Sequence, residues 1–207
     1  MTDFKKLKTE NILPILAASA ALRKVNDLLA LINLAESRNI NFMKIYETLL
    51  QNYLFTGYPS ALVSLKILKS VYPDKQIRKM SDMNLYHFKR IGVAHCQKVY
   101  GPKYNKLISN IKSFSPDISE WLVLEGYGKV MGRKGLSFKE RELCIVAVLA
   151  VLRFEDQLYS HINGAFRAKV TIIKINDVIK NLDLLGKKNL SAFGLRVLKR
   201  FKAEKGM

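Results

Sequence analysis

Hydrophobic residues recur at helical spacing along nearly the whole chain, and helix-start signals separate one segment from the next. Ser137 and Glu140 have the spacing of a capping box, in which the serine oxygen and the glutamate carboxylate satisfy free backbone amides reciprocally. Further starts are expected at Asn11, Asn41, Pro59, Pro102 and Ser115. The β-branched run 170–175 finds no partner strand with an alternating pattern, so it is predicted to be a helix after a Thr171 cap. The pattern predicts an all-α fold.

The sequence also resembles itself when it is shifted by 130 positions. Identical residues meet at twelve of the 37 positions from 11 to 47, and a one-residue slip then pairs Gly57 with Gly186. Helical repeats bury their apolar faces against each other. We therefore expect a single all-α domain over 1–207, in which a pseudo-twofold relates two four-helix repeats. The repeats span about 9–72 and 137–203, and a helical middle of about 75–132 joins them.

Composition excludes several classes of protein. With 49% hydrophobic residues the chain is apolar enough to fold, even at a net charge of +18. The longest apolar run, 143–152, is about half the length of a membrane span, so no membrane partner is expected. The only cysteines, Cys96 and Cys144, form no disulfide framework, which favours the reducing cytoplasm. The apolar stretch 12–18 after three lysines imitates a secretory signal, but the repeat needs it as a core helix.

One cluster of residues differs between the two repeats. Glu142 stands opposite an isoleucine, His161 opposite a leucine, and Gly164 opposite another leucine. A helical hairpin that turns near 153–155 makes Glu142 and His161 face each other, and Gly164 leaves space on the same face. A carboxylate–imidazole pair beside a small cavity is suited to proton transfer. The alternative is a core histidine bonded to Glu142, with Gly164 only allowing close helix packing.

The second half of the chain carries a recognisable series of motifs. Arg-Glu-Leu at 141–143 is followed by Glu-Asp-Gln-Leu-x-x-His-Ile-x-Gly-Ala at 155–165 and by Ile-x-Asp-Val-Ile at 175–179. This series resembles the signature domain of the carboxymuconolactone decarboxylase family, which includes the alkylhydroperoxidase D-like proteins. Segment 115–136 resembles the lead-in of the decarboxylase branch, and 57–61 resembles the segment that closes its repeat. The resemblance implies an all-α, cofactor-free fold that assembles into homo-oligomers, commonly trimers or hexamers.

The two chemistries of that family differ in their need for cysteine. The peroxidase branch carries a CxxC just before the histidine, and the matching positions here are Phe154 and Gln157. This departure removes the redox dithiol, and Cys144 is more readily explained as a buried small hydrophobe. The resemblance therefore favours the decarboxylase branch, which loses carbon dioxide from a small carboxylated lactone or related acid.

The resemblance also implies roles for individual residues. His161 donates a proton to carbon, and Glu142 orients and charges it. Arg133 and Arg141 hold carboxylates of a small anionic substrate, although surface or interface positions are equally open to them. Tyr127 lines the pocket or simply packs, and Gly164 gives the substrate room.

The basic charge invites a nucleic-acid interpretation, since 74–112 and 187–207 supply 13 of the 18 excess charges. However, lysine outnumbers arginine 25 to 10, the lysines scatter at helical spacing, and no nucleic-acid motif is present. A solvated face that attracts an anionic substrate explains the charge better. No metal site is expected either, because no carboxylate completes a ligand pattern with His87 and His95. A decarboxylase-like lyase is favoured over a residual peroxidase and over a non-catalytic oligomeric or nucleic-acid-binding protein.

Overall fold

The computed structural model of the chain describes residues 4–77, 84–186 and 189–207. Within these ranges every regular element is a helix, so the fold is all-α, as the hydrophobic pattern predicts. The chain divides into two compact units. Unit 1 comprises Met1–Lys75 and Gly135–Met207, and unit 2 comprises Gln76–Lys134. Both predicted repeats thus fall in unit 1, and the predicted helical middle falls in unit 2.

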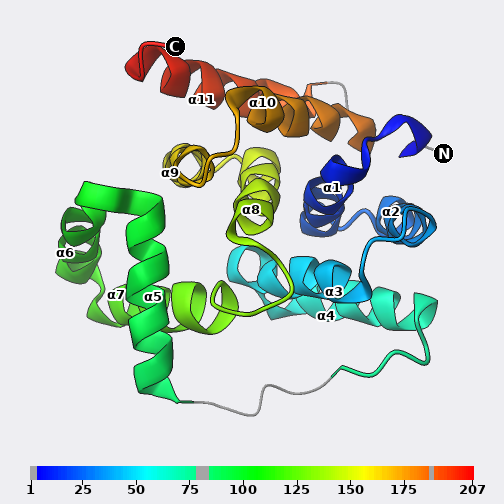
Figure 1. Cartoon of the computed structure of the whole chain (residues 1–207), viewed down its shortest axis with the longest axis horizontal. Helices are drawn as coiled ribbons and strands as arrows, with labels where there is room; N and C mark the ends of the chain where they lie inside the picture. Colours follow the sequence, from blue (N-terminus) through cyan, green and yellow to red (C-terminus); the bar gives the residue numbers. More distant parts are fainter. Residues whose placement is uncertain (1–3, 78–83, 187–188) are drawn as a thin grey trace. The chain divides into compact units, whose positions relative to one another are not determined.

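Unit 1 is built around two central helices that pack against each other, α1 and α8 (Figure 1). Residues 11–21 of α1 and 141–151 of α8 are all buried, as expected of helices that are surrounded by others. The unit contains α1 (Thr9–Ala21), α2 (Val25–Ser37), α3 (Phe42–Gln51), α4 (Tyr53–Val71), α8 (Phe138–Leu152), α9 (Glu155–Arg167), α10 (Ile172–Asn181) and α11 (Leu190–Glu204), with short 3₁₀ turns η1 (Phe4–Lys6) and η4 (Leu182–Leu185). Helices α1 and α8 thus form the hydrophobic core of unit 1, and the other helices of the unit pack around them.

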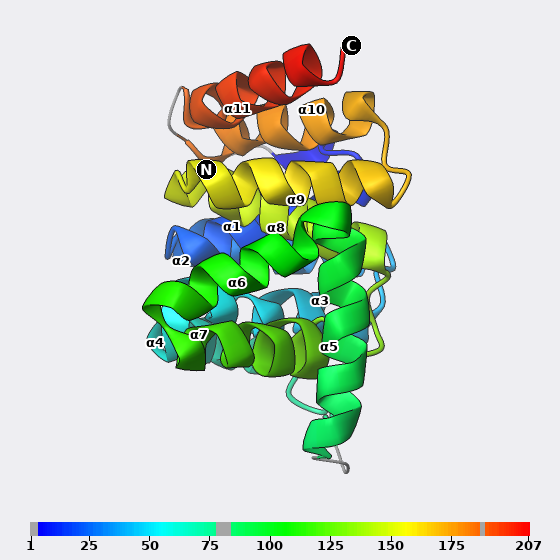
Figure 2. The same cartoon turned by 90° about the vertical axis from the view of Figure 1, so that its left-hand side faces the viewer.

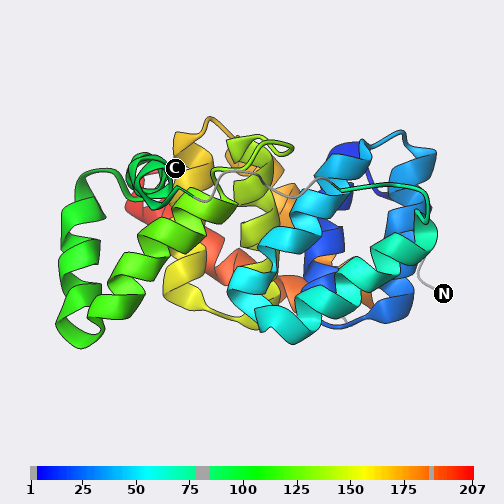
Figure 3. The ribbon, with the colours of Figure 1, turned by 90° about the horizontal axis from the view of Figure 1, so that it is seen from below.

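The outer helices of unit 1 cover this core in pairs. Helix α9 packs along α8, and α10 and α11 pack against each other (Figure 2). Helices α3 and α4, coloured cyan, lie next to each other in the view from below (Figure 3). Gly57 interrupts α4 with a φ of +73°, a conformation that glycine adopts without steric cost.

Several helix starts are where the sequence predicts them. The capping box of Ser137 and Glu140 is present in full, and Asn41 and Thr171 cap α3 and α10. Residues 172–175 are helical, which confirms the choice of helix over strand for most of this run. The start predicted at Asn11 is wrong, because α1 begins two residues earlier and the Asn11 amide donates to Asp177 at 2.8 Å.

Unit 2 contains α5 (Leu85–Tyr100), η2 (Gly101–Lys103), α6 (Tyr104–Phe114), α7 (Pro116–Trp121) and the π-helical segment η3 (Leu122–Val130). Ser115 caps α7 as predicted, whereas the helix expected at Pro102 begins at Tyr104 after the short turn η2. Helix α5 packs against η3, and glycines sit at the closest approach. A Cβ on Gly92 would lie 2.0 Å from the carbonyl oxygen of Val123, so only glycine fits there.

Candidate functional site

Glu142 and His161 meet across the hairpin of α8 and α9. Arg153, with a φ of +62°, ends α8, and the next helix begins at Glu155. This tight turn places Oε2 of Glu142 3.0 Å from Nδ1 of His161. Glu142 is 0% exposed and His161 is 6% exposed. The structure therefore brings together the two residues that the repeat comparison singled out, and their catalytic role stays a prediction.

An aromatic ring contacts the His161 side of this pair, and one carboxylate oxygen on the Glu142 side has no hydrogen bond among the described residues. Phe55 of α4 approaches the His161 ring edge-on, with 6.4 Å between the ring centroids. The other carboxylate oxygen of Glu142, Oε1, is buried and accepts no hydrogen bond from the residues that the structure describes. A buried oxygen of this kind normally has a partner, so Oε1 has hydrogen-bonding capacity to spare beside the imidazole. Gly164 is buried on α9 one turn after His161, and the substrate space expected beside it stays a prediction.

Arg141 is engaged by the protein itself. Its guanidinium lies 2.9 Å from Oε2 of Glu47 and 3.1 Å from Oε1 of Gln51, both on α3. All three side chains are buried. This geometry argues against the expectation that Arg141 holds a substrate carboxylate, because both terminal nitrogens of its guanidinium already donate to internal partners. Sequence reasoning missed Glu47, although its alignment with the acidic Asp177 under the 130-residue shift was an available signal.

Tyr127 and Arg133 belong to unit 2 and are described within it. Tyr127 is buried in η3, and its ring meets Tyr100 edge-on at 6.2 Å between centroids. Its carbonyl oxygen lies 3.2 Å from Nδ1 of His95. Arg133 follows η3, and its backbone amide donates to Val130 at 3.2 Å. Packing thus accounts for Tyr127 within its unit, and the pocket roles of both residues stay predictions.

The two thiols are poor nucleophiles. Cys144 and Cys96 are both buried, and burial raises the pKa of each thiol to about 12. The positions that match the family's CxxC, Phe154 and Gln157, are exposed at the start of α9. Because the thiolate is the reactive form, neither cysteine supports a peroxidase reaction near neutral pH.

No group of three or more potential metal ligands occurs in the described part of the chain. Among the same residues, no helix combines the length and the apolarity that crossing a membrane requires. The basic segments that invited a nucleic-acid interpretation are covered only in part, because Lys187 and Lys188 and the stretch 78–83 lie outside the described residues. Nucleic-acid binding therefore stays a less favoured alternative prediction from the sequence.

Comparison with known proteins finds a family that resembles the segment in which this site lies. Residues 116–200 match the Carboxymuconolactone decarboxylase family. Over 88 residues, 42% of this chain and 66% of the relative, the chain is 31% identical to 4-carboxymuconolactone decarboxylase of Acinetobacter baylyi. Over 135 residues, 63% of this chain and 62% of the relative, it is 26% identical to Peroxisomal protein 2 of Schizosaccharomyces pombe.

The segment 116–200 is therefore similar to the carboxymuconolactone decarboxylase family. The matched segment includes both Glu142 and His161. In both comparisons the chain spans slightly less than two thirds of the relative's length.

Proposed function

We propose that the chain is a cofactor-free decarboxylase that acts on a small carboxylated lactone or a related acid, with His161 as the general acid. The observation that carries the proposal is the 3.0 Å contact between Nδ1 of His161 and the fully buried carboxylate of Glu142. The pair lies in the segment that matches the family, and one relative is named for decarboxylation of 4-carboxymuconolactone.

Decarboxylation leaves an electron pair on the substrate, which must be stabilised and then protonated. The bond between the substrate carbon and its carboxylate breaks, carbon dioxide leaves, and the electron pair remains on the lactone as an enolate. Nε2 of His161, acting as the general acid, then gives a proton to carbon, which forms the new C–H bond. Glu142 occupies Nδ1, so it fixes the ring orientation and makes Nε2 the atom that exchanges the proton.

The proposed substrate is an anion, which the net positive charge of the protein attracts. The net charge of +18 raises the local concentration of carboxylates around the protein. Arg141 is already paired with Glu47, so it is not proposed as a partner of a substrate carboxylate. Gly164, on the same helix as His161, is proposed to line the pocket. No observation favours the peroxidase alternative, since both thiols are buried.

The test is turnover of 4-carboxymuconolactone by the full-length chain, followed as release of carbon dioxide. Removing a general acid lowers kcat by about 10²–10⁴-fold, and we expect this loss in His161→Ala. His87→Ala, which removes an exposed histidine of unit 2, is the matched control and keeps full activity. Equal activity of His161→Ala and the wild type would refute the assigned role. If the wild type processes only a different carboxylated lactone, the reaction class stands and the substrate changes.

We also propose that unit 1 is an internal duplication with a shift of 130 residues. Two ion pairs support it, because Lys44 lies 2.6 Å from Glu140 and Lys174 lies 2.9 Å from Glu10. Under the shift of 130 residues, Lys44 corresponds to Lys174 and Glu10 corresponds to Glu140. Each pair joins a lysine of one repeat to a glutamate of the other, as a pseudo-twofold requires. The shift also relates two residues with left-handed backbone, Arg23 and Arg153.

The proposed assembly rests on the family resemblance, and the proposed location rests on the two cysteines, which form no disulfide framework. We propose a cytoplasmic homo-oligomer, a trimer or a hexamer. Light scattering after gel filtration tests the assembly, because the mass must be three or six times the 23.6 kDa of one chain. A mass of 23.6 kDa in dilute and concentrated samples would refute it.

A further inference from the structure

A cavity of about 560 Å³ opens in unit 1 where the two proposed repeats meet. Its walls come from α1, α3, α8 and α10 and from the connection 38–41. Its size is that of cavities that hold small molecules. Neither Glu142 nor His161 lines it, so it is separate from the candidate decarboxylase site.

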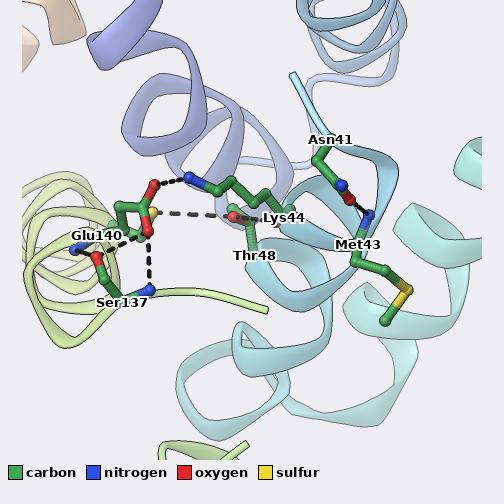
Figure 4. A network of polar contacts seen from close by, with 7 residues as sticks. Asn41, Met43, Lys44, Thr48, Ser137 and Glu140 are labelled. Carbon is green, nitrogen blue, oxygen red and sulfur yellow. Dashed lines mark hydrogen bonds and ion pairs between the residues drawn. The ribbon is translucent and has the colours of Figure 1, made fainter. Parts of the chain in front are cut away.

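Positive charge exceeds negative charge at this cavity. Two acidic residues line it, and each is already paired with a lysine. Lys44 holds Glu140, as Figure 4 shows, and Lys174 holds Glu10. The other two cations that line the cavity are Arg38 and Lys139. The lining therefore offers two positive charges beyond those that its own carboxylates neutralise.

Neither of these two cations is bound to a carboxylate among the described residues. Arg38 donates to the backbone carbonyl of Lys5 at 3.2 Å, which leaves the guanidinium charge uncompensated. Lys139 is exposed on the first turn of α8, next to Glu140. The Glu140 carboxylate is held by Lys44 and by the backbone and side chain of Ser137. An anion from outside is the partner that these cations lack.

The start of α1 adds to the attraction for an anion. Thr9, the first residue of α1, lines the cavity, and the preceding Lys8 makes no side-chain capping hydrogen bond. The first amides of a helix carry partial positive charge and bind anions when no cap occupies them. In contrast, the start of α8 at the same cavity is closed by its capping box. The cations and these backbone amides point to the same class of ligand.

Apolar side chains complete the lining and define the rest of the ligand. Leu13, Pro14, Ile40 and Leu143 all face the cavity. An inorganic anion would leave this apolar surface in contact with water, whereas an apolar body would cover it. We propose that the cavity binds an organic acid, an apolar body that carries a carboxylate or a sulfonate, as a second ligand site. This site goes beyond the proposed decarboxylase function and does not depend on it.

The probe is 8-anilinonaphthalene-1-sulfonate, an anionic group on apolar rings, titrated into the full-length chain by fluorescence. We expect saturable binding that weakens as salt is added. Lys139→Glu reverses one charge at the cavity, and its matched control is Lys199→Glu on α11, which is also exposed and does not line the cavity. Lys139→Glu should weaken binding by about fivefold or more relative to Lys199→Glu, because a charge near 4 Å contributes about 1 kcal/mol even in water.

Two further measurements separate this site from other apolar surfaces. Thr9→Trp places a bulky ring at an exposed lining position and should lower binding without changing the thermal unfolding temperature. N-phenyl-1-naphthylamine has the same rings without the sulfonate and should bind several-fold more weakly. The proposal is overturned if Lys139→Glu and Thr9→Trp both bind the sulfonate like the wild type, or if the neutral probe binds equally well. His161→Ala must leave sulfonate binding unchanged, which keeps this test independent of the decarboxylase assignment.

Discussion

Arg141 of α8 and Glu47 of α3 form an ion pair at 2.9 Å, with both side chains only 1% exposed. Gln51 accepts a further hydrogen bond from the same guanidinium. Arg141 directly precedes Glu142, so the pair anchors the turn of α8 from which the candidate catalytic carboxylate projects. A buried charge that loses its partner is far more costly than a buried pair that is intact.

This ion pair leads to a prediction about stability. Arg141→Met removes the guanidinium that faces the buried Glu47 carboxylate, and it should lower the free energy of unfolding by about 3–5 kcal/mol. Urea unfolding followed by circular dichroism measures the change. The double variant Arg141→Met/Glu47→Leu removes both charges and should recover most of the loss.

Arg200→Met is the control at an exposed ion pair. Arg200 lies 2.9 Å from Glu204 but is about half exposed, and such pairs contribute about 0–1 kcal/mol. If Arg141→Met costs no more than this control, the buried pair is not the anchor described here.

Glu142→Gln tests the positioning role of the candidate carboxylate. The amide keeps the shape of the side chain and removes the charge that faces Nδ1 of His161. Loss of a residue that orients a reacting group typically costs about 10–100-fold, and we expect kcat to fall by this factor. The pH profile of kcat must also move, because the charge next to the imidazole is gone. A purely structural role would lower stability and leave the pH profile in place.

Glu36→Gln provides the matched control, since Glu36 is exposed on α2 and makes the same change of charge. It should alter neither kcat nor the pH profile. An unchanged pH profile in Glu142→Gln as well would rule out coupling between the carboxylate and the imidazole.

Features that depend on a few adjacent residues were predictable from the sequence. The capping box at Ser137 and the cap at Thr171 join groups only three residues apart. The contact between Glu142 and His161 could be predicted from the sequence for a related reason. The two helices are consecutive, and the turn between them is too short to allow many relative placements.

Features that depend on distant partners were not predictable. Asn11 looked like a helix cap, but its amide bonds Asp177, which is 166 residues away. Arg141 looked like a carboxylate-binding arginine, and its carboxylate turned out to be Glu47, 94 residues away. Neighbouring positions on a helix point about 100° apart, so the choice of partner depends on tertiary packing that a local pattern does not contain.

Because both thiols are buried, we expect them to react slowly with thiol reagents in the folded protein. At pH 8, 5,5′-dithiobis(2-nitrobenzoate) should react with neither Cys96 nor Cys144 in the folded protein, because burial raises the pKa of each to about 12. Both should react within the same period in 8 M urea, which serves as the control. Fast reaction of one thiol in the folded chain would reopen the peroxidase alternative.

Glu140 predicts a dependence of stability on pH. Burial alone would raise the pKa of its carboxyl group, but the hydrogen bonds from Lys44 and Ser137 outweigh burial and lower the pKa below its usual 4.5. A carboxylate whose pKa is lower in the folded state stabilises the protein at pH values above its unfolded pKa. This contribution is lost as the pH falls through the folded pKa, because the folded and unfolded states then bind the same proton.

Glu140→Gln should therefore be less stable than the wild type at pH 7, by roughly 1 kcal/mol for a partly exposed pair that also serves as a cap. The difference should shrink as the pH falls from about 5 to about 3, because the wild type loses the same contribution by protonation. Thermal unfolding at a series of pH values measures both effects. Glu10→Gln is the matched control from the other repeat, where the carboxylate is 63% exposed, and it should cost less at pH 7. A loss in Glu140→Gln that is equally large at pH 3 and pH 7 would show that the side chain acts through packing rather than through its charge.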